Sequence, residues 1–168
     1  PWVFQGSVDK GKADPGETVR VESATGQFLA WASFSPSSMI RVRAWSFDEA
    51  ERIDADFFAG RIRAAVALRQ RLGIASNGVR LIHGEADGLP GLIVDRYEDI
   101  LSVQFLSAGT DRWKATIADA LLAETDGDLS AELVWARPPQ PEFPSKAWDN
   151  RIGAGLALAL VLERSGKR

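Results

Sequence analysis

The chain has 168 residues, of which 45% are hydrophobic and 26% charged, and a formal net charge of −3, a composition typical of globular proteins with one or two small domains. It contains no cysteine, which excludes disulfides, cysteine-ligated zinc and a cysteine nucleophile within these residues. No apolar run reaches the roughly 18 residues of a membrane span, so we expect a cytoplasmic protein without membrane contact.

The first 47 residues are predicted to form a small antiparallel β-barrel or sandwich. Pro1 to Phe4 is either one turn of helix or an extended lead. Thr18 to Glu22 alternates apolar and polar residues, as a half-buried strand does. Gln27 to Ser35 and Ile40 to Phe47 are predicted to be the next two strands, because both are rich in β-branched and aromatic residues and are bounded by turn residues.

The strand from Ile40 to Phe47 carries the first candidate site. Arg41, Arg43 and Trp45 occupy alternate positions, so they are predicted to share one face. Guanidiniums bind phosphate bidentately and an indole stacks on an unpaired base, which indicates single-stranded RNA. The alternative is a solvated face in which the tryptophan lies on the arginine stems.

The distribution of charge favours the N-terminal part for RNA binding. Residues 1–46 carry five Lys and Arg against four Asp and Glu, whereas residues 73–125 carry four against eight. Lys10 and Lys12 therefore join the predicted RNA-binding residues.

A helix is predicted from Ala55 to Leu72, with Asp54 as its N-cap and Gly73 closing it. Its arginines form either a solvated face or a second phosphate-binding surface. The predicted apolar stripe is Phe58, Ile62, Ala65, Val66 and Leu72, and the arginines are Arg61, Arg63, Arg69 and Arg71.

A strand-turn-strand element is predicted from Leu81 to Tyr97, with turns at Asp87-Gly88 and Pro90-Gly91. Its ionisable residues form either an acid-base site or a loop held by Asx turns with a surface pair between Asp95 and Arg96. The only histidine has no second histidine or cysteine to complete a metal site, so we expect it to be structural and predict no metal. The ionisable residues are His83, Glu85, Asp87, Asp95 and Arg96.

A strand from Ile100 to Leu106 follows, and then a helix from Arg112 to Leu122 capped by Thr110 or Asp111. Beyond Ala123, residues 131–136 are a candidate strand and residues 137–144 a polyproline-like loop. Ile152 to Leu162 is either a buried strand or a short helix.

The segment from Gly84 to Tyr97 resembles the G-E-x-D-G-L-P-G-L-x-V-D-R-Y signature of the large-subunit rRNA cytosine-5 methyltransferases of the RlmI type. Three other segments agree in the same order, and the resemblance covers roughly Pro1 to Ala123, returning at Leu162 to Ser165. The agreeing segments are Pro1 to Gly6, Phe34-Ser35-Pro36 with Arg41 to Arg43, and Phe105 to Gly109.

The resemblance implies a PUA-like RNA-binding domain, a central α/β domain, and a further domain that carries S-adenosylmethionine and the catalytic cysteine. We therefore expect an α+β chain with a PUA-like antiparallel barrel at residues 1–47, missing its first strand because the chain begins at Pro1 as a processed product or a fragment. A central α/β domain is expected at 48–125, and a Pro- and Trp-containing segment at 126–168. A complete Rossmann methyltransferase domain is not expected.

The function that the resemblance implies is the RNA-binding and positioning part of an S-adenosylmethionine-dependent rRNA cytosine-5 methyltransferase that acts on large-subunit rRNA. Because the chain lacks the cysteine and the glycine-rich cofactor motif, we expect it to bind no cofactor and to be inactive alone. The motif residues are expected to be structural: Gly84, Glu85, Asp87, Gly88, Pro90, Gly91, Asp95 and Arg96.

Two other functions remain possible from the sequence. One is a protein interaction or homodimerisation module that uses Trp2, Trp31 or the segment containing Trp135 and Trp148. The other is a hydrolase in which Glu85, Asp87 and Asp95 act with Arg96.

Overall fold

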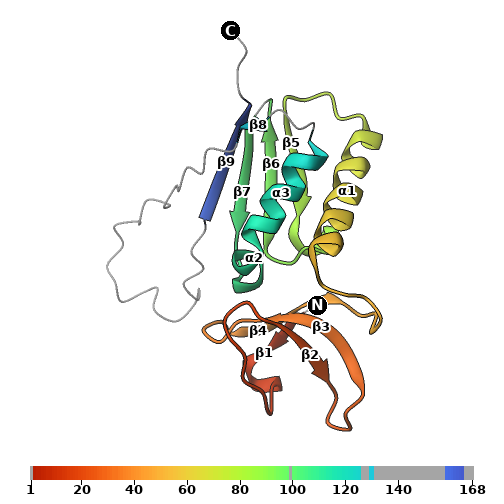
Figure 1. The fold of residues 1–168 in the computed structure, drawn as a ribbon, viewed down its shortest axis with the longest axis vertical. Coiled ribbons are helices and arrows are strands. Elements are labelled where there is room, and N and C mark those ends of the chain that lie inside the picture. Colours follow the sequence, from red (N-terminus) through yellow and green to blue (C-terminus); the bar gives the residue numbers. More distant parts are fainter. Residues whose placement is uncertain (1, 99, 126–128, 131–157, 165–168) are drawn as a thin grey trace, which may run out of the picture.

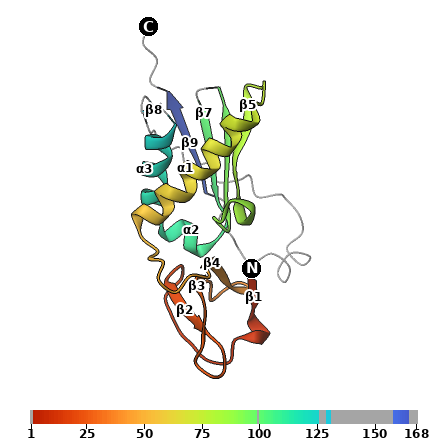
Figure 2. The same cartoon turned by 90° about the vertical axis from the view of Figure 1, so that its right-hand side faces the viewer.

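The computed structural model describes residues 2–98, 100–125, 129–130 and 158–164, which form two lobes, each built on its own antiparallel sheet (Figure 1). The N-terminal lobe comprises residues 2–47, and the second lobe begins with the helix at Ala55. In the two views the lobes lie one above the other, with the helices of the second lobe on one face of its sheet (Figures 1 and 2). This confirms the predicted mixed architecture of an antiparallel β part followed by an α/β part.

The N-terminal lobe is a four-stranded sheet with the order β1-β4-β3-β2. Its first residues are extended and are followed by a single 3-10 turn, η1, at Gln5–Ser7. The other strands lie within one residue of their predicted bounds. The strands are β1 Trp2–Phe4, β2 Thr18–Glu22, β3 Phe28–Phe34 and β4 Ile40–Ser46.

The second lobe has a five-stranded sheet with the order β5-β6-β7-β9-β8. The predicted hairpin is present, and the short 3-10 helix η2 (Gly84–Asp87) lies in its turn. The strands are β5 Gly78–His83, β6 Leu92–Tyr97, β7 Ile100–Phe105, β8 Leu129–Ser130 and β9 Leu158–Arg164. The helices are α1 Ala55–Leu72, α2 Ala108–Arg112 and α3 Lys114–Glu124.

Helix α1 begins and ends where its local signals predict. The Asp54 carboxylate accepts a hydrogen bond from the Phe57 N–H at 3.2 Å, and Gly73 follows the last turn with a φ of 58°. The predicted stripe is buried except for Leu72, which is exposed because it occupies the last helical position, beyond the packed part of the helix. The stripe packs with α3 and the sheet in a core that includes Ile117, Leu121, Val94 and Val103.

The segment after β7 differs from the prediction. A helix was expected from Arg112, but α2 already begins at Ala108 because Ser107 is the N-cap. The Ser107 Oγ accepts the Thr110 N–H at 3.2 Å, and the Thr110 side chain accepts from the Ser107 N–H at 3.3 Å, which completes a capping box. Thr110 is thus the third helical residue rather than the cap.

The two lobes pack directly on each other. The Trp45 side chain from β4 is only 3% exposed and meets the rings of Phe57 and Phe58 from α1, with centroids 6.5 and 5.4 Å apart. A Cβ on Gly109 of α2 would overlap Ser33 of β3 and lie 2.8 Å from Trp45 Cζ2. The contact between the lobes therefore depends on the absence of a side chain at position 109.

Part of the C-terminal prediction can be compared with the structure. Leu158–Arg164 is the strand β9, antiparallel to β7. The segment Ile152 to Leu162 was predicted to be either a strand or a short helix, and the strand alternative is correct for residues 158–162. The candidate strand at 131–136, the polyproline-like segment, Trp135 and Trp148 lie outside the described residues. Among the helices that the structure describes, none is both long enough and apolar enough to cross a bilayer.

The exposed helical residue Gly60 provides a test of α1. A Cβ added there would meet nothing within 4 Å, so Gly60→Ala should raise the free energy of unfolding by about 0.5–1 kcal/mol through helix propensity alone. Chemical denaturation measures this. A decrease would show that this face of α1 is covered.

Candidate nucleic-acid interface

Strand β4 does not present the predicted row of side chains. Ala44 pairs with Ala32 and Ser46 with Trp31, so the register shifts and Trp45 is the extra residue of a β-bulge. The bulge directs Trp45 into the core between the lobes, where it is buried. The prediction that Trp45 stacks on an RNA base is therefore wrong, because strict alternation along β4 ends at the bulge.

Arg41 and Arg43 remain partly exposed on β4, and each donates a long hydrogen bond to a backbone carbonyl of its own lobe: Arg41 Nη1 to Ser35 O at 3.5 Å and Arg43 Nη1 to Ile40 O at 3.4 Å. Within the described residues neither guanidinium forms an ion pair. Burial lowers the pKa of the Arg43 guanidinium from its ordinary value, and the nearby Glu85 carboxylate opposes this shift. Each guanidinium has further N–H donors available beyond these bonds.

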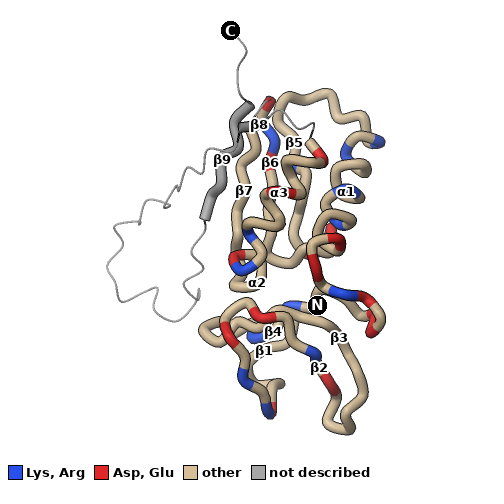
Figure 3. Tube along the Cα trace, viewed as in Figure 1, with Lys and Arg blue, Asp and Glu red and all other residues tan. Residues whose placement is uncertain are grey.

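Lys10 and Lys12 are exposed in the connection between η1 and β2. Neither forms an ion pair with any residue that the structure describes. Figure 3 shows the lysines and arginines of the N-terminal lobe on this connection and on the strands, interspersed with carboxylates. The lobe therefore offers separate cations rather than one broad basic face.

Two aromatic side chains that the sequence prediction did not assign to RNA lie on β1, the strand that pairs with β4. Trp2 and Phe4 on the edge strand β1 are 49% and 52% exposed. Trp2 is directly opposite Arg43 in the β1–β4 pairing, so the two side chains share a face. The only signal in the sequence is the alternation in Trp2-Val3-Phe4, which is too short to identify a strand.

The carboxylates of the hairpin each have a basic or N–H partner. The Trp2 Nε1 donates to Glu85 Oε1 at 2.7 Å. Asp87 accepts two bonds from Arg69, at 2.5 and 2.7 Å, and one from the His83 N–H at 2.6 Å.

Asp95 is held by Arg80, whose Nε and Nη2 donate to its two oxygens at 2.7 and 3.0 Å. The predicted pair between Asp95 and Arg96 is therefore wrong, because neighbouring residues on a strand point to opposite faces. Arg96 instead donates from Nε to the Glu98 carbonyl at 2.9 Å. Each of the three carboxylates is hydrogen-bonded to a different side chain: Glu85 to Trp2, Asp87 to Arg69 and Asp95 to Arg80. This arrangement does not favour the hydrolase alternative.

The turn glycines and Pro90 attach the hairpin to α2. Gly91 has a φ of 83°, and a Cβ there would lie 2.6 Å from Ser107 Oγ. The Ser107 hydroxyl donates to the Pro90 carbonyl at 3.3 Å, and the Thr110 hydroxyl donates to the Gly91 carbonyl at 3.3 Å. Gly84 and Gly88 also have positive φ, of 52° and 70°. These contacts connect the Gly84 to Arg96 motif to α2, as expected for a structural role.

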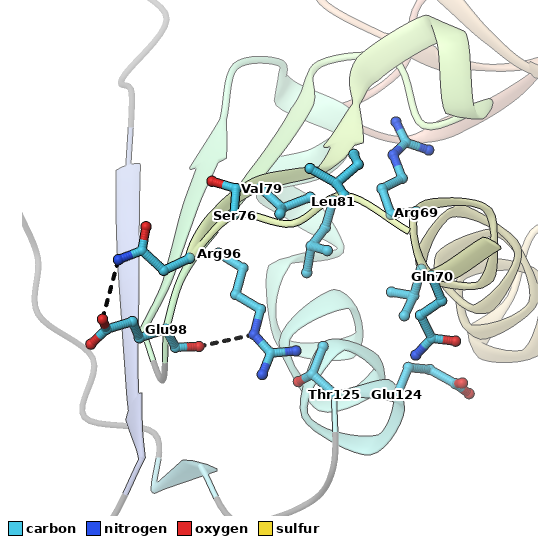
Figure 4. Close-up of a pocket in the computed structure, with 12 residues that line it drawn as sticks. Arg69, Gln70, Ser76, Val79, Leu81, Arg96, Glu98, Glu124 and Thr125 are labelled. Carbon is cyan, nitrogen blue, oxygen red and sulfur yellow. Dashed lines mark hydrogen bonds between the residues drawn. The ribbon is translucent and has the colours of Figure 1, made fainter. Parts of the chain in front are cut away.

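A cavity of about 320 Å³ in the second lobe is lined by residues of α1, β5, β6 and the end of α3 (Figure 4). Its walls combine apolar side chains of α1 and β5, such as Val66 and Val79, with Arg96, Glu98 and Glu124. In Figure 4 the Arg96 side chain reaches toward Thr125. No group of side chains with metal-ligand character occurs among the described residues.

Comparison with known proteins gives the following relationships. Residues 1–47 match the PUA-like domain family. A protein of Erwinia tasmaniensis, "Ribosomal RNA large subunit methyltransferase I", is 49% identical over 125 residues, which is 72% of this chain and 32% of that protein. A protein of the same name from Shewanella denitrificans is 44% identical over 173 residues, covering 99% of this chain and 43% of its own length.

Solved structures agree on the fold. A chain from Streptococcus mutans described as a candidate SAM-dependent methyltransferase superimposes with a TM-score of 0.64 at 15% identity, over 73% of this chain and 33% of that one. A second candidate methyltransferase, solved with S-adenosylhomocysteine, gives a TM-score of 0.65 at 15% identity. The chain thus spans 32–43% of the length of these relatives and solved chains.

Proposed function

We propose that this chain is the RNA-binding and substrate-positioning part of an S-adenosylmethionine-dependent rRNA methyltransferase. The premise is that it is related to proteins named ribosomal RNA large subunit methyltransferase I over part of their length. Its substrate would be large-subunit rRNA, and the modified atom C5 of a cytosine. The observation that carries the proposal is the PUA-like match over residues 1–47 in a chain with these relatives.

Positioning requires that bound RNA keep a fixed orientation relative to the rest of the enzyme. The direct packing of Trp45 on Phe57 and Phe58 and the close approach at Gly109 support this, because they leave the N-terminal lobe little freedom to turn on the second lobe. RNA held by the first lobe would then be presented at a constant distance and angle. Orientation of this kind can account for a large part of the rate acceleration in a group-transfer enzyme.

The residues that the structure describes do not fit S-adenosylmethionine. Both sheets are antiparallel, whereas dinucleotide-type cofactors bind at the carboxyl edge of a parallel sheet beside a glycine-rich turn. The cavity beside Arg96 has a polar rim of mixed charge and no such turn. We therefore place cofactor binding and methyl transfer outside the described residues and derive no catalytic step for this chain.

The test is binding of a labelled, protein-free fragment of large-subunit rRNA, followed by fluorescence anisotropy from 50 to 300 mM salt. We expect the logarithm of the affinity to fall linearly with the logarithm of the salt concentration. The double variant Arg41→Gln with Arg43→Gln should make this slope shallower by about 1–1.5, since each phosphate contact contributes about 0.7 on single strands. Lys10→Gln with Lys12→Gln should have a smaller effect in the same direction.

Arg63→Gln is the matched control, because its guanidinium already pairs with Glu124 at 2.7 Å in the other lobe. Absence of salt-dependent RNA binding by the unaltered chain at 50 mM salt would refute the proposed function. Calorimetry with S-adenosylmethionine is expected to show no binding, and a measurable affinity would contradict the placement of the cofactor elsewhere.

A further inference from the structure

We infer that Trp2 and Phe4 of β1 form a stacking platform for unpaired RNA bases, with the neighbouring phosphates held by Arg43 and Arg41 of β4. This inference rests on the proposed function and specifies which part of the N-terminal lobe contacts RNA and in which form. The ligand class is single-stranded RNA, because base faces are accessible to stacking only where the bases are unpaired.

The first argument is the exposure of both rings. Trp2 and Phe4 are alternate residues of β1, which is an edge strand of the sheet that the described residues form, and about half the surface of each lies in solvent. Large aromatic side chains next to each other on a soluble lobe are costly to leave exposed and usually mark a binding surface. Aromatic residues on strands that stack two or three bases are a recurrent device in RNA-binding sheets.

The second argument is the position of the arginines. Trp2 pairs with Arg43 and Val3 with Val42, but Phe4 pairs with Ile40, so Arg41 is the extra residue of a bulge beside Phe4. The Trp2 ring thus has Arg43 opposite it, and Arg41 follows the residue that pairs with Phe4. Within the described residues neither guanidinium forms a salt bridge, although Arg43 lies close enough to the Glu85 carboxylate for its pKa to be affected. An aromatic face beside a guanidinium with unused donors matches the base and the phosphate of one nucleotide.

The third argument is that the Trp2 ring is already fixed. Its Nε1 donates to the Glu85 carboxylate at 2.7 Å, so the indole does not lose rotational freedom when a base stacks on it. Glu85 lies in η2 of the second lobe, near both Trp2 and Arg43, so its negative charge weakens phosphate binding at Arg43 relative to Arg41. The RNA backbone is therefore expected to follow β4 from Arg43 toward Arg41, away from η2.

A second copy of the chain is the rival occupant of this surface. Strand β1 is an edge strand, and Met39 next to it is also exposed, so a strand-to-strand dimer is conceivable. Two copies related by a twofold axis would bring Arg41 and Arg43 of both protomers together, with the Glu85 carboxylate near Arg43 in each copy. The positive charge beside the rings favours an anionic ligand instead.

The experiment uses the full chain and a fluorescein-labelled 12-nucleotide single-stranded RNA of mixed sequence in anisotropy titrations at 50 mM salt. Trp2→Ala and Phe4→Ala should each weaken binding by about 5- to 100-fold, the usual loss for one stacked base. The salt dependence should stay unchanged, because no charge is lost. Trp2→Phe keeps an aromatic face and should bind within about threefold of the unaltered chain.

Three further measurements separate stacking from other effects. Phe47→Ala removes an exposed aromatic side chain just after the end of β4 and should leave affinity unchanged. Glu85→Gln keeps the hydrogen-bond acceptor for Trp2 but removes the charge, and should tighten binding at low salt. The same RNA annealed to its complement should bind more weakly than the single strand, and the difference should disappear in Trp2→Ala.

The outcomes distinguish this inference from the proposed function. If the unaltered chain binds RNA but Trp2→Ala and Phe4→Ala change affinity by less than twofold while remaining folded by circular dichroism, the platform is wrong and RNA binding lies elsewhere. If the unaltered chain binds no RNA, the proposed function itself fails. Concentration-dependent sedimentation that Trp2→Ala abolishes would assign the surface to a second copy and overturn the inference.

Discussion

Asp87→Asn is expected to lower the free energy of unfolding by about 3–5 kcal/mol, the usual cost of removing one partner of a buried ion pair. The side chains of Arg69 and Asp87 are only 14% and 6% exposed, and the contact is bidentate. An asparagine can still accept the hydrogen bond from the His83 N–H. The loss of stability therefore reports the removal of the negative charge that balances Arg69. Urea denaturation at a constant m-value measures it.

Asp95→Asn is the matched control, since it also removes one carboxylate of the hairpin. Its partner Arg80 is 47% exposed, and solvent screens that pair, so we expect a loss of only about 1 kcal/mol. Adding Arg69→Met to Asp87→Asn should recover stability, because the unbalanced cation is removed. Equal losses from Asp87→Asn and Asp95→Asn, or no recovery in the double variant, would contradict this account of the pair.

The same two substitutions separate structure from chemistry. A hydrolase that uses the hairpin carboxylates would lose its activity in both variants while keeping its denaturation midpoint. If the carboxylates are structural, the substitutions should instead change stability. RNA affinity, measured below the melting transition, should be retained. The motif from Gly84 to Arg96 is then explained by the connection it makes between β5, α1 and α2.

Gly109→Ala is expected to destabilise the chain by about 2–3 kcal/mol, at the upper end of the cost of overpacking. The new Cβ would overlap Ser33 and lie 2.8 Å from Trp45 Cζ2, and both neighbours are buried. Since neither can move into solvent, the lobes must separate or α2 must shift. Chemical denaturation gives the loss, and a red shift of tryptophan emission would report the exposure of Trp45.

Gly16→Ala tests the same contact from the other lobe. Gly16 has a φ of 77°, and a Cβ there would overlap the Ala108 carbonyl, so backbone strain adds to the steric conflict. Gly60→Ala controls for the general effect of adding a methyl group. A Gly109→Ala variant with the same midpoint as the unaltered chain would show that the lobes are not held by this contact.

The elements that could be predicted from the sequence are those whose signals are local. Asp54 and Gly73 lie next to the ends of α1, and the alternation from Thr18 to Glu22 identifies β2 without reference to its partners. The turn residues of the hairpin have the same character. A resemblance over four ordered motifs added the PUA-like assignment, which the family match over residues 1–47 confirms.

The features that could not be predicted depend on pairing between distant segments. The bulge that buries Trp45 is a property of the β3–β4 register, and the bonds from Arg80 to Asp95 and from Trp2 to Glu85 join residues far apart in the chain. Arg41 and Arg43 were placed on the correct strand by their alternation. Trp2 and Phe4 could not be recognised as their neighbours, because a three-residue strand has too short a pattern.

The position of β9 inside the second sheet has a consequence for how the chain folds. Strand β9 lies between β7 and β8, and its first residue, Leu158, pairs with Phe105. Closing a loop of about 50 residues costs entropy before any of the pairing is gained, which slows this step relative to the local β5–β6–β7 meander. On the ribosome, β7 would therefore remain an open edge until the segment containing β9 emerges, and this is the interval in which the chain is most exposed to pairing with other chains.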